Sequence, residues 1–236
     1  ELILADLETV TTRLSKIEKR AKMSKDKQEQ LEFEVLTKAK DALLKNQVLR
    51  NVKFKEEELK IVKSYQFLTI KPVIYLANIN EEELGCLENN YVKKVREYAE
   101  QDQARVICLC AKIEEELSEL DKEEKIEMLE ALGLKESGLD LLIKATYDLL
   151  GLATYFTVGK DEVRAWTFKK GSNAKKCAGI IHTDFEKGFI KAEVISYEDL
   201  ITYGSELKVK EAGKARLEGK DYLMQDGDIC HFRFNV

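Results

Sequence analysis

Apolar residues in the first third of the chain recur at helical spacing. A stripe with alternating steps of three and four predicts a first helix, and it consists of Leu7, Val10, Leu14, Ile17 and Ala21. A polar break over 23–28 separates this stripe from a looser apolar face over about 29–46. Two helices joined by one short polar link predict an antiparallel helical hairpin of the coiled-coil type. Another helix is expected over 56–68.

The middle of the chain changes to short continuous apolar runs. Residues 73–77 have the pattern of a strand that is buried on both faces, and 105–111 form a second such run. A helix is expected between them, over about 89–101. Strand, helix and strand at this spacing predict a βαβ unit with a parallel sheet. Acidic helices are expected over 114–132, and a further helix over 139–150.

The last part of the chain, about 85 residues, is rich in alternating patterns. Residues 154–158 and 163–168 alternate like a hairpin across a turn. A short helix is expected near 174–181. Later strands are expected over 189–197, 222–224 and 229–234. The predicted fold class is α/β followed by a small α+β domain, divided into 1–68 for the helical region, 69–150 for the α/β part and 151–236 for the small domain.

Charge is distributed unevenly along the chain. Residues 11–63 hold fifteen Lys and Arg against nine Asp and Glu, whereas 64–148 hold ten against nineteen. This segregation predicts a basic helical arm beside an acidic body, although the net charge is −5. The basic side chains are either a solvated helix surface or a ligand-binding surface. The candidates are Arg13, Lys16, Lys19, Arg20, Lys22, Lys25 and Lys27.

Cysteine and histidine offer little catalytic or metal-binding chemistry. The five cysteines contain no C-x-x-C pair, so we expect free thiols in a reducing compartment, the cytoplasm. His182, Asp184 and Glu186 could suggest metal ligands, but hydrogen-bonded structural roles are favoured and no metal site is expected. No apolar stretch approaches the roughly 20 residues of a membrane span, and no signal peptide is recognised, so no membrane partner is expected.

Two short motifs follow the two predicted parallel strands. Asn78-Ile-Asn-Glu81 follows the first strand, and Cys110-Ala-Lys112 ends the second. Ligands of open α/β sheets bind outside the carboxyl ends of the strands. Guanine-binding P-loop proteins carry Asn-Lys-x-Asp and Ser-Ala-Lys there; the Asn braces the loop and contacts the base, the Lys stem covers it, and a backbone amide meets its edge. The candidate base-binding residues are therefore Asn78, Ile79, Glu81, Cys110, Ala111 and Lys112, unless Asn78 and Glu81 are ordinary loop caps.

Longer motifs resemble the YchF (Obg-like ATPase) family. The resembling segments are 4–10, 71–78, 155–168, 178–189 and 222–235, so the match covers essentially the whole chain. The resemblance implies a P-loop NTPase domain that is interrupted by a helical hairpin and followed by a ubiquitin-like β-grasp domain, the TGS domain. It also implies a ribosome-associated protein that acts in translation or stress responses.

The same resemblance implies a preference for ATP over GTP, because the family reads the base with N-x-x-E and Asn78 and Glu81 match it. Adenine lacks the two adjacent donors that the Asp of Asn-Lys-x-Asp receives, and Ile79 could pack on the base. The sequence contains no G-x-x-x-x-G-K-[ST], the loop that binds phosphates and Mg²⁺. The resemblance places that loop upstream of Glu1.

We therefore expect a C-terminal portion of an ATPase, as if cut from a longer protein. It would be a monomer without catalytic residues or tightly bound ATP. The alternative function is an RNA- or ribosome-binding module, made of the basic hairpin and the small domain, that acts without nucleotide.

Overall fold

A computed structural model describes the chain except residues 24–25, 85–88, 160–161 and 236, and except the side chains of Arg20 and Lys22. The chain divides into two compact units, Glu1–Gly138 and Leu139–Val236.

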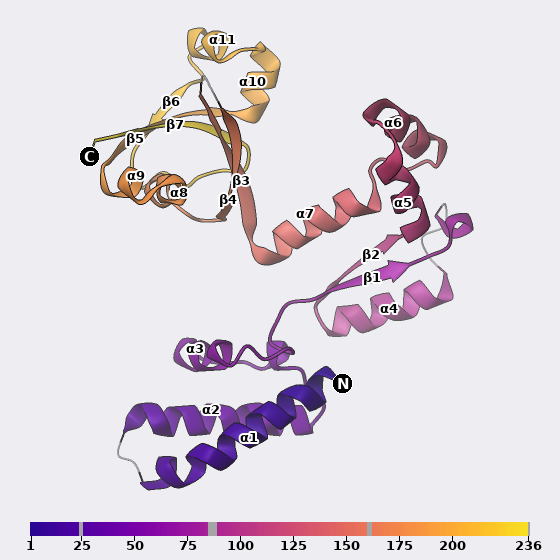
Figure 1. The fold of residues 1–236 in the computed structure, drawn as a ribbon, viewed down its shortest axis with the longest axis vertical. Helices are drawn as coiled ribbons and strands as arrows, with labels where there is room; N and C mark the ends of the chain where they lie inside the picture. Colours follow the sequence, from indigo (N-terminus) through magenta and orange to yellow (C-terminus); the bar gives the residue numbers. More distant parts are fainter. Residues whose placement is uncertain (24–25, 85–88, 160–161, 236) are drawn as a thin grey trace. The chain divides into compact units, whose positions relative to one another are not determined.

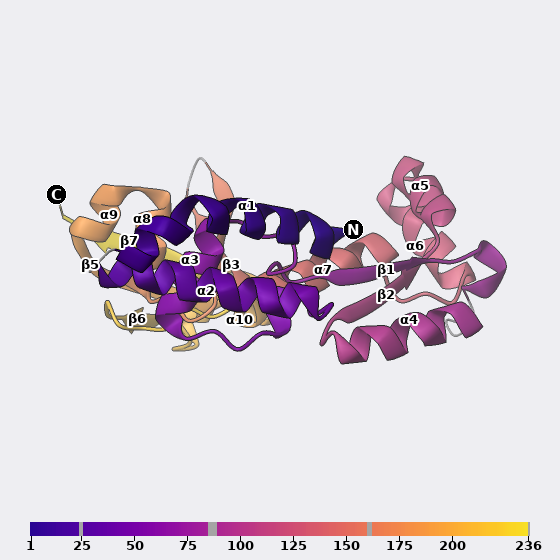
Figure 2. The same cartoon turned by 90° about the horizontal axis from the view of Figure 1, so that it is seen from below.

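The first unit begins with a pair of helices that lie side by side and run in opposite directions, α1 (Leu2–Met23) and α2 (Lys27–Leu44) (Figures 1 and 2). The predicted helices are present and are longer than the apolar stripes. Their apolar faces meet because residues three and four apart share one side of a helix. Val10 and Val35 are buried in this core, and the turn η1 (Leu49–Asn51) and α3 (Glu56–Ser64) complete it.

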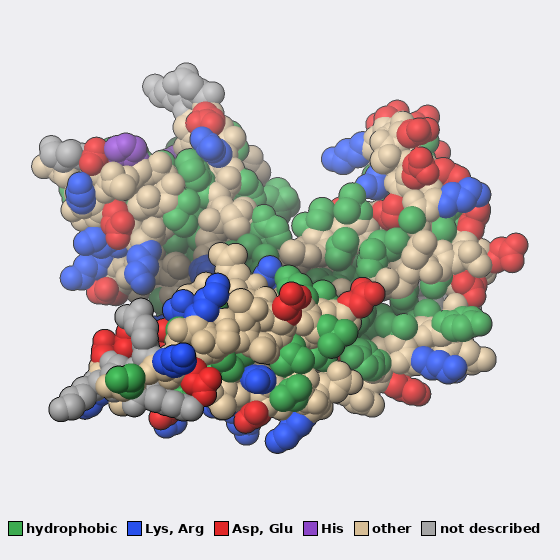
Figure 3. Space-filling model, turned by 60° about the horizontal axis from the view of Figure 1, so that its bottom comes forward, with side chains coloured by type: hydrophobic (Ala, Val, Ile, Leu, Met, Phe, Trp, Pro, Cys, Tyr) green, Lys and Arg blue, Asp and Glu red, His purple; other side chains and the backbone are tan. Residues whose placement is uncertain are grey.

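A βαβ unit follows the helical pair, as predicted. β1 (Ile74–Asn78) and β2 (Arg105–Leu109) are parallel, and α4 (Asn90–Gln101) connects them. A short turn, η2 (Glu81–Glu83), follows β1, and α5 (Ala111–Glu119) and α6 (Lys122–Ala131) follow β2. Acidic side chains gather over α5 and α6 (Figure 3).

The prediction that the first strand is buried on both faces is wrong for β1. Ala77 is half-buried against the cluster that contains Val92 of α4, but Leu76 on the opposite face is 48% exposed. Successive side chains of a strand point to opposite faces, so α4 can cover only one of the two sets. Among the described residues β1 pairs with β2 alone, in a sheet too narrow to shield Leu76 from the side.

A buried carboxylate joins the helical part to the βαβ unit. Asp102, at the end of α4, is 7% exposed and forms an ion pair with Arg50 of η1. Arg50 Nε lies 3.1 Å from Asp102 Oδ1, and the Tyr75 hydroxyl of β1 donates to Oδ2 at 2.8 Å. Asn51 Nδ2 donates a fourth hydrogen bond at 3.3 Å. Burial raises the pKa of Asp102, but the hydrogen bonds from Arg50 and Tyr75 outweigh it and lower the pKa overall.

A second buried aspartate ties α1 to the chain that leaves the helical part. Asp6, 3% exposed, accepts the backbone N–H groups of Leu68 at 2.8 Å and Thr69 at 2.7 Å. The carbonyl of Thr69 in turn accepts the backbone N–H of Arg50 at 3.0 Å. Hydrogen bonds therefore connect α1 continuously to the carboxylate of Asp102 beside β1.

The second unit is built on a five-stranded mixed sheet in the order β4-β3-β7-β5-β6. β3 and β7 are parallel in its middle, and the other neighbours are antiparallel. The strands are β3 (Leu152–Val158), β4 (Val163–Lys169), β5 (Phe189–Ser196), β6 (Arg216–Glu218) and β7 (Asp228–Phe234). The predicted hairpin of β3 and β4 is present.

Helices cover both faces of this sheet. α8 (Ala174–Ile181) packs on one face, where the buried Tyr155 hydroxyl donates to the carbonyl of Cys177 at 2.8 Å. α11 (Glu206–Glu211) buries Val209 with Ile195 and Ile229 on the other face. Two more short helices, α9 (Thr183–Lys187) and α10 (Tyr197–Tyr203), precede α11. These three short helices were not predicted, because five to seven residues are too few to display a periodicity.

One feature of the second unit differs from the sequence-based prediction. The predicted strand at 222–224 is wrong, because Leu223 forms only an isolated bridge with Asn173, and the edge strand is β6. The two compact units divide at 138/139, and the start of the small domain at 151 stays a prediction. α7 (Gly138–Leu150) lies largely in the second unit, where Asp148 pairs with Lys170 at 2.9 Å.

Candidate functional site

The two predicted motifs leave the same edge of the β1–β2 sheet. Asn78 and Leu109 form the last aligned pair of the parallel strands, and the N–H of Ile79 donates to the carbonyl of Leu109 at 2.9 Å. The residues that follow both strands therefore emerge side by side. This is the edge at which open α/β sheets bind ligands. We refer to Asn78, Glu81, Ala111 and Lys112 as the strand-end site.

Asn78 joins the ends of the two strands directly. Its Oδ1 atom accepts the backbone N–H of Ala111 at 3.0 Å. Ala111 is the first residue of α5, and Cys110 before it makes no side-chain cap. The first N–H groups of a helix have no partner within the helix, so Asn78 caps α5 from the neighbouring strand. The bracing role expected for the asparagine is thus present, but the amide expected to meet a base edge is already engaged.

Glu81 and Lys112 form a second link across the strand-end site. Lys112 Nζ lies 3.0 Å from Glu81 Oε2 and 3.8 Å from Glu116 Oε1. The hydrogen bond to Glu81 is the main cause that raises the pKa of Lys112. Both side chains are exposed, so solvent screens the pair and it can rearrange around a ligand.

Ile79 and Cys110 do not belong to this surface. They are 7% and 4% exposed and lie in one cluster with Val92 of α4 and Ile113 of α5. The inward alternation of β1 continues one residue past the strand, so Ile79 faces the core. The expectation that Ile79 packs on a base is therefore corrected. Four of the six predicted residues lie at the surface.

The basic residues of the helical pair are less uniform than their charge suggested. Arg13 Nη2 pairs with Glu32 Oε1 of α2 at 2.8 Å, and its Nε donates to the Tyr65 hydroxyl at 2.9 Å. The hydrogen bond that Arg13 donates to Glu32, and after it the one to Tyr65, raise the pKa of Arg13. Its charge is paired within the fold, although the side chain stays 43% exposed, so its assignment as a contact for RNA stays a prediction.

Lys16, Lys19 and Lys27 are exposed, as a contact surface requires. Lys25, and the side chains of Arg20 and Lys22, lie outside the described residues. Carboxylates are interspersed among the Lys and Arg side chains of this part of the molecule (Figure 3). Among the described residues, the proposed electrostatic footprint therefore rests on Lys16, Lys19 and Lys27.

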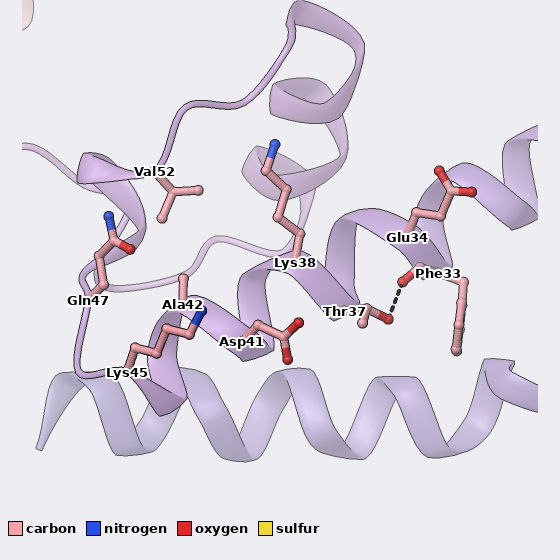
Figure 4. A pocket seen from close by; sticks show the side chains of 9 residues that line it. All are labelled: Phe33, Glu34, Thr37, Lys38, Asp41, Ala42, Lys45, Gln47 and Val52. Carbon is pink, nitrogen blue, oxygen red and sulfur yellow. Dashed lines mark hydrogen bonds between the residues drawn. The ribbon is translucent and has the colours of Figure 1, made fainter.

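A hollow of about 520 Å³ lies along α2, away from the strand-end site (Figure 4). Phe33, Thr37 and Asp41 of α2 line it, with Val52 opposite. Lys38 crosses it to donate to the carbonyl of Lys53 at 2.8 Å and pairs with Glu58 at 2.8 Å. Lys38, one of the two lysines that line the hollow with Lys45, is therefore engaged within the fold.

Metal-binding and membrane-spanning features are not found in the described part of the chain. No group of three or more His, Cys, Asp or Glu is placed there to hold a metal ion. His182 Nδ1 accepts the backbone N–H of Asp184 at 3.2 Å and so caps α9, a hydrogen-bonded structural role. No helix in the described ranges is both long and apolar enough to cross a membrane.

The fold and the strand-end site define an α/β protein in which a parallel βαβ unit is joined to a helical pair and a separate mixed-sheet unit. The YchF-GTPase_C family model, described as "Protein of unknown function (DUF933)", matches residues 152–235. Ribosome-binding ATPase YchF of Bacillus subtilis is 57% identical over 237 residues, and that of Haemophilus influenzae is 52% identical over 236 residues. Both alignments cover the whole chain. The chain belongs to the YchF family.

A solved structure supports the same assignment. The YchF GTPase of Schizosaccharomyces pombe superimposes with a TM-score of 0.84 at 35% sequence identity, over 99% of this chain and 63% of that one. The chain spans 64% of the length of the Bacillus and Haemophilus relatives. The binding and hydrolysis for which the whole relatives are named can therefore only be proposed for this chain.

Proposed function

We propose that the chain supplies the adenine-reading part of an ATP-binding and ATP-hydrolysing protein that associates with ribosomes. The observation that carries this proposal is the hydrogen bond from Ala111 to Asn78, which joins the ends of β1 and β2 where α/β sheets bind ligands. Glu81 adds a carboxylate at the same place, an acceptor suited to the amino group of adenine. Lys112 adds a long stem that can lie along a base.

Hydrolysis would need groups that this sequence does not contain. Phosphoryl transfer depends on backbone N–H groups and a Lys around the phosphates, with Mg²⁺ to neutralise charge. No G-x-x-x-x-G-K-[ST] motif is present in the chain. In the proposed protein, residues outside this sequence hold the phosphates and Mg²⁺, and the strand-end site orients the base. By itself the chain would neither hold ATP tightly nor hydrolyse it.

The proposal assigns three parts to the chain. Residues 1–68 form a helical hairpin inserted into the nucleotide-binding domain, 69–150 form the last part of that domain, and 151–236 form a TGS domain. The mixed sheet with parallel β3 and β7 in its middle and α8 across one face supports a β-grasp fold for the last part.

Titration of the ¹⁵N-labelled chain with AMP and GMP, followed by NMR, tests base reading. We expect the backbone resonances of Asn78, Glu81, Ala111 and Lys112 to shift, with AMP binding in the millimolar range and GMP more weakly. Lys122, an exposed lysine that starts α6, offers a matched control: Lys112→Ala should weaken AMP binding and Lys122→Ala should not. Shifts that avoid the strand-end site, or equal affinities for the two nucleotides, would refute the proposal.

A second function, ribosome or RNA binding without nucleotide, is favoured by a separate observation. The Bacillus and Haemophilus relatives are named for ribosome binding, and the helical pair exposes Lys16, Lys19 and Lys27. We propose that this helical pair contacts ribosomal RNA through phosphates, with the TGS domain as a second contact. A ribosome-bound protein would work in the cytoplasm.

A further inference from the structure

The two edges of the mixed sheet in the second unit differ in length. Among the described residues β6, at one edge, has three residues, whereas β4, at the other, has seven in continuous register with β3 (Figure 1). Proteins usually protect a sheet edge by keeping it short, or with proline or a bulge, because its unpaired N–H and C=O groups can pair with another chain. β4 contains neither proline nor a bulge. We propose that β4 binds an extended segment of a partner protein, which carries a large apolar side chain between carboxylates and adds to the sheet as a further strand.

The hydrogen bonds between β3 and β4 show which backbone groups point away from the sheet. Just beyond the last aligned pair, the N–H of Lys170 donates to the carbonyl of Gly151 at 2.8 Å. Hydrogen-bonded and non-bonded pairs alternate along antiparallel strands, so the even-numbered residues of β4 bond to β3. The N–H and C=O groups of Ala165 and Thr167 therefore point outward. No backbone group among the described residues engages them from that side.

An apolar groove of about 800 Å³ lies on the sheet face beside this edge. Phe156 of β3 and Ala165 of β4 line it and are paired across the two strands, so their side chains share this face. Ile143 and Tyr147 of α7 also line the groove, as does Tyr197 at the start of α10. Ala165 is exposed, and its methyl group is too small to close the groove at the edge. A large apolar side chain on the residue opposite Ala165 would therefore enter the groove.

The groove is present before any partner binds, because contacts fix α7 to the sheet. The Tyr147 hydroxyl lies 3.2 Å from Thr167 Oγ1 of β4. Asp148, the next residue of α7, pairs with Lys170 at 2.9 Å. A preformed groove avoids much of the cost of ordering side chains when a partner binds.

The charges of β4 favour an acidic partner. Arg164 lies 4.2 Å above the Trp166 ring, on the face opposite the groove, and its side chain is 55% exposed. Lys169 is exposed at the end of the strand. Alternate residues of an added strand would lie beside Arg164, where carboxylates complement its charge. A second copy of β4 would instead bring like charges together, so a different protein is the favoured occupant.

A short peptide tests the proposal on the complete chain. Acetyl-Glu-Val-Glu-Phe-Glu-Val-Glu-amide alternates apolar and acidic residues and has one aromatic side chain in the middle. We expect the amide resonances of Ala165 and Thr167 to shift on titration, and their hydrogen exchange to slow by about tenfold or more at saturation. Serine in place of the phenylalanine should weaken binding by about tenfold.

Two matched variants test whether the phenylalanine enters the groove. Ile143, 48% exposed, lines the groove, whereas Ile180, 43% exposed, belongs to α8 on the opposite face of the sheet. Ile143→Asn should weaken the phenylalanine peptide by about fivefold and leave the serine peptide unchanged. Ile180→Asn should change neither. Equal effects of the two variants on the phenylalanine peptide would refute the assignment of the groove.

Methylation of peptide nitrogens tests strand addition without altering the protein. In an antiparallel addition the residue opposite Ala165 points both its N–H and its C=O at β4, and its neighbours in the peptide point theirs away. Methylating the phenylalanine nitrogen should therefore abolish binding, whereas methylating the nitrogen of the glutamate before it should largely preserve binding. Equal losses from the two methylations would rule out strand addition.

The remaining outcomes also decide the matter. No binding of the phenylalanine peptide, or shifts that avoid Ala165 and Thr167, would overturn the proposal. A chain that sediments as a dimer with both amides already protected would also overturn it, because a second copy then covers the edge. A uridine heptamer that shifts these amides when the peptide does not would assign the surface to RNA instead. None of these measurements involves the strand-end site, so they leave the proposed function untouched.

Discussion

Replacing Asp102 by Asn should destabilise the first unit and leave the second unit unaffected. The substitution keeps the shape of the side chain but removes the charge that faces the Arg50 guanidinium, whose side chain is only 15% exposed. It also places an amide donor among the donors of Arg50, Asn51 and Tyr75. Breaking a buried ion pair from one side costs about 3–5 kcal/mol, and the remaining amide oxygen can still accept hydrogen bonds. We therefore expect a loss of about 3 kcal/mol in the free energy of unfolding.

Urea unfolding can follow the two units separately. The single tryptophan, Trp166, lies on β4 in the second unit, where its Nε1 donates to the Thr157 hydroxyl at 2.9 Å. Its fluorescence reports on that unit, whereas circular dichroism at 222 nm includes the long helices of the first. With a urea dependence of about 1–3 kcal/mol per molar, the midpoint by circular dichroism should fall by about 1–3 M. The fluorescence midpoint should not move.

Two controls make this expectation refutable. Glu56 pairs with Lys60 at 3.7 Å, and both side chains are more than 75% exposed, so Glu56→Gln should change stability by less than about 0.5 kcal/mol. The pKa of Asp102 is lowered in the folded chain, so its stabilisation is present above the ordinary Asp pKa of about 3.9 and is lost as the pH falls through the folded value. The difference between Asp102→Asn and the unmodified chain should therefore be constant at neutral pH and shrink below about pH 4. An Asp102→Asn variant as stable as Glu56→Gln at pH 7 would refute the reasoning.

Three further predictions follow from other parts of the chain. The chain alone should hydrolyse neither ATP nor GTP above buffer background; Mg²⁺-dependent phosphate release that rises with chain concentration would contradict this. Reversing Lys16, Lys19 and Lys27 to Glu should weaken ribosome co-sedimentation. The slope of the logarithm of the binding constant against the logarithm of salt concentration should become less steep by up to about three, one for each lost phosphate contact. Unchanged sedimentation of the folded variant would rule out this footprint. Tyr155→Phe removes the buried hydrogen bond to the carbonyl of Cys177, so Trp166 fluorescence should report a loss of about 0.5–1.5 kcal/mol, and an unchanged midpoint would argue against that bond.

The long elements could be predicted because their sequence patterns are set by local geometry. The stripe through Val10 and Leu14 fits one side of α1, and the apolar runs correspond to β1 and β2. The position of the strand-end site also follows from local order, since parallel strands place their carboxyl ends at one edge. Asn78 and Ala111 are 33 residues apart in sequence, and this rule predicts that they meet.

The roles of single side chains could not be predicted in the same way. The sequence does not show whether Ile79 continues the inward alternation of β1 or turns outward with the loop, and packing against α4 and α5 decides it. Arg13 donates hydrogen bonds to Glu32 and Tyr65, which lie 19 and 52 residues away in sequence. A count of basic residues could not detect these contacts. The strand expected at 222–224 has suitable residues, but β6 occupies the sheet edge beside β5.

The hydrogen bonds of Asp6 also affect how the arm formed by α1 and α2 can vary in length. Asp6 holds Leu68 and Thr69, so the two ends of a segment of more than 60 residues are fixed at one place. Equal numbers of residues could be added or removed where α1 ends and α2 begins, at the end of the arm far from Asp6. Such changes would lengthen or shorten the arm without shifting the chain that enters β1. Because the cost of closing a loop grows only with the logarithm of its length, such changes should be thermodynamically inexpensive. The reach of the arm towards a partner can therefore change independently of the strand-end site.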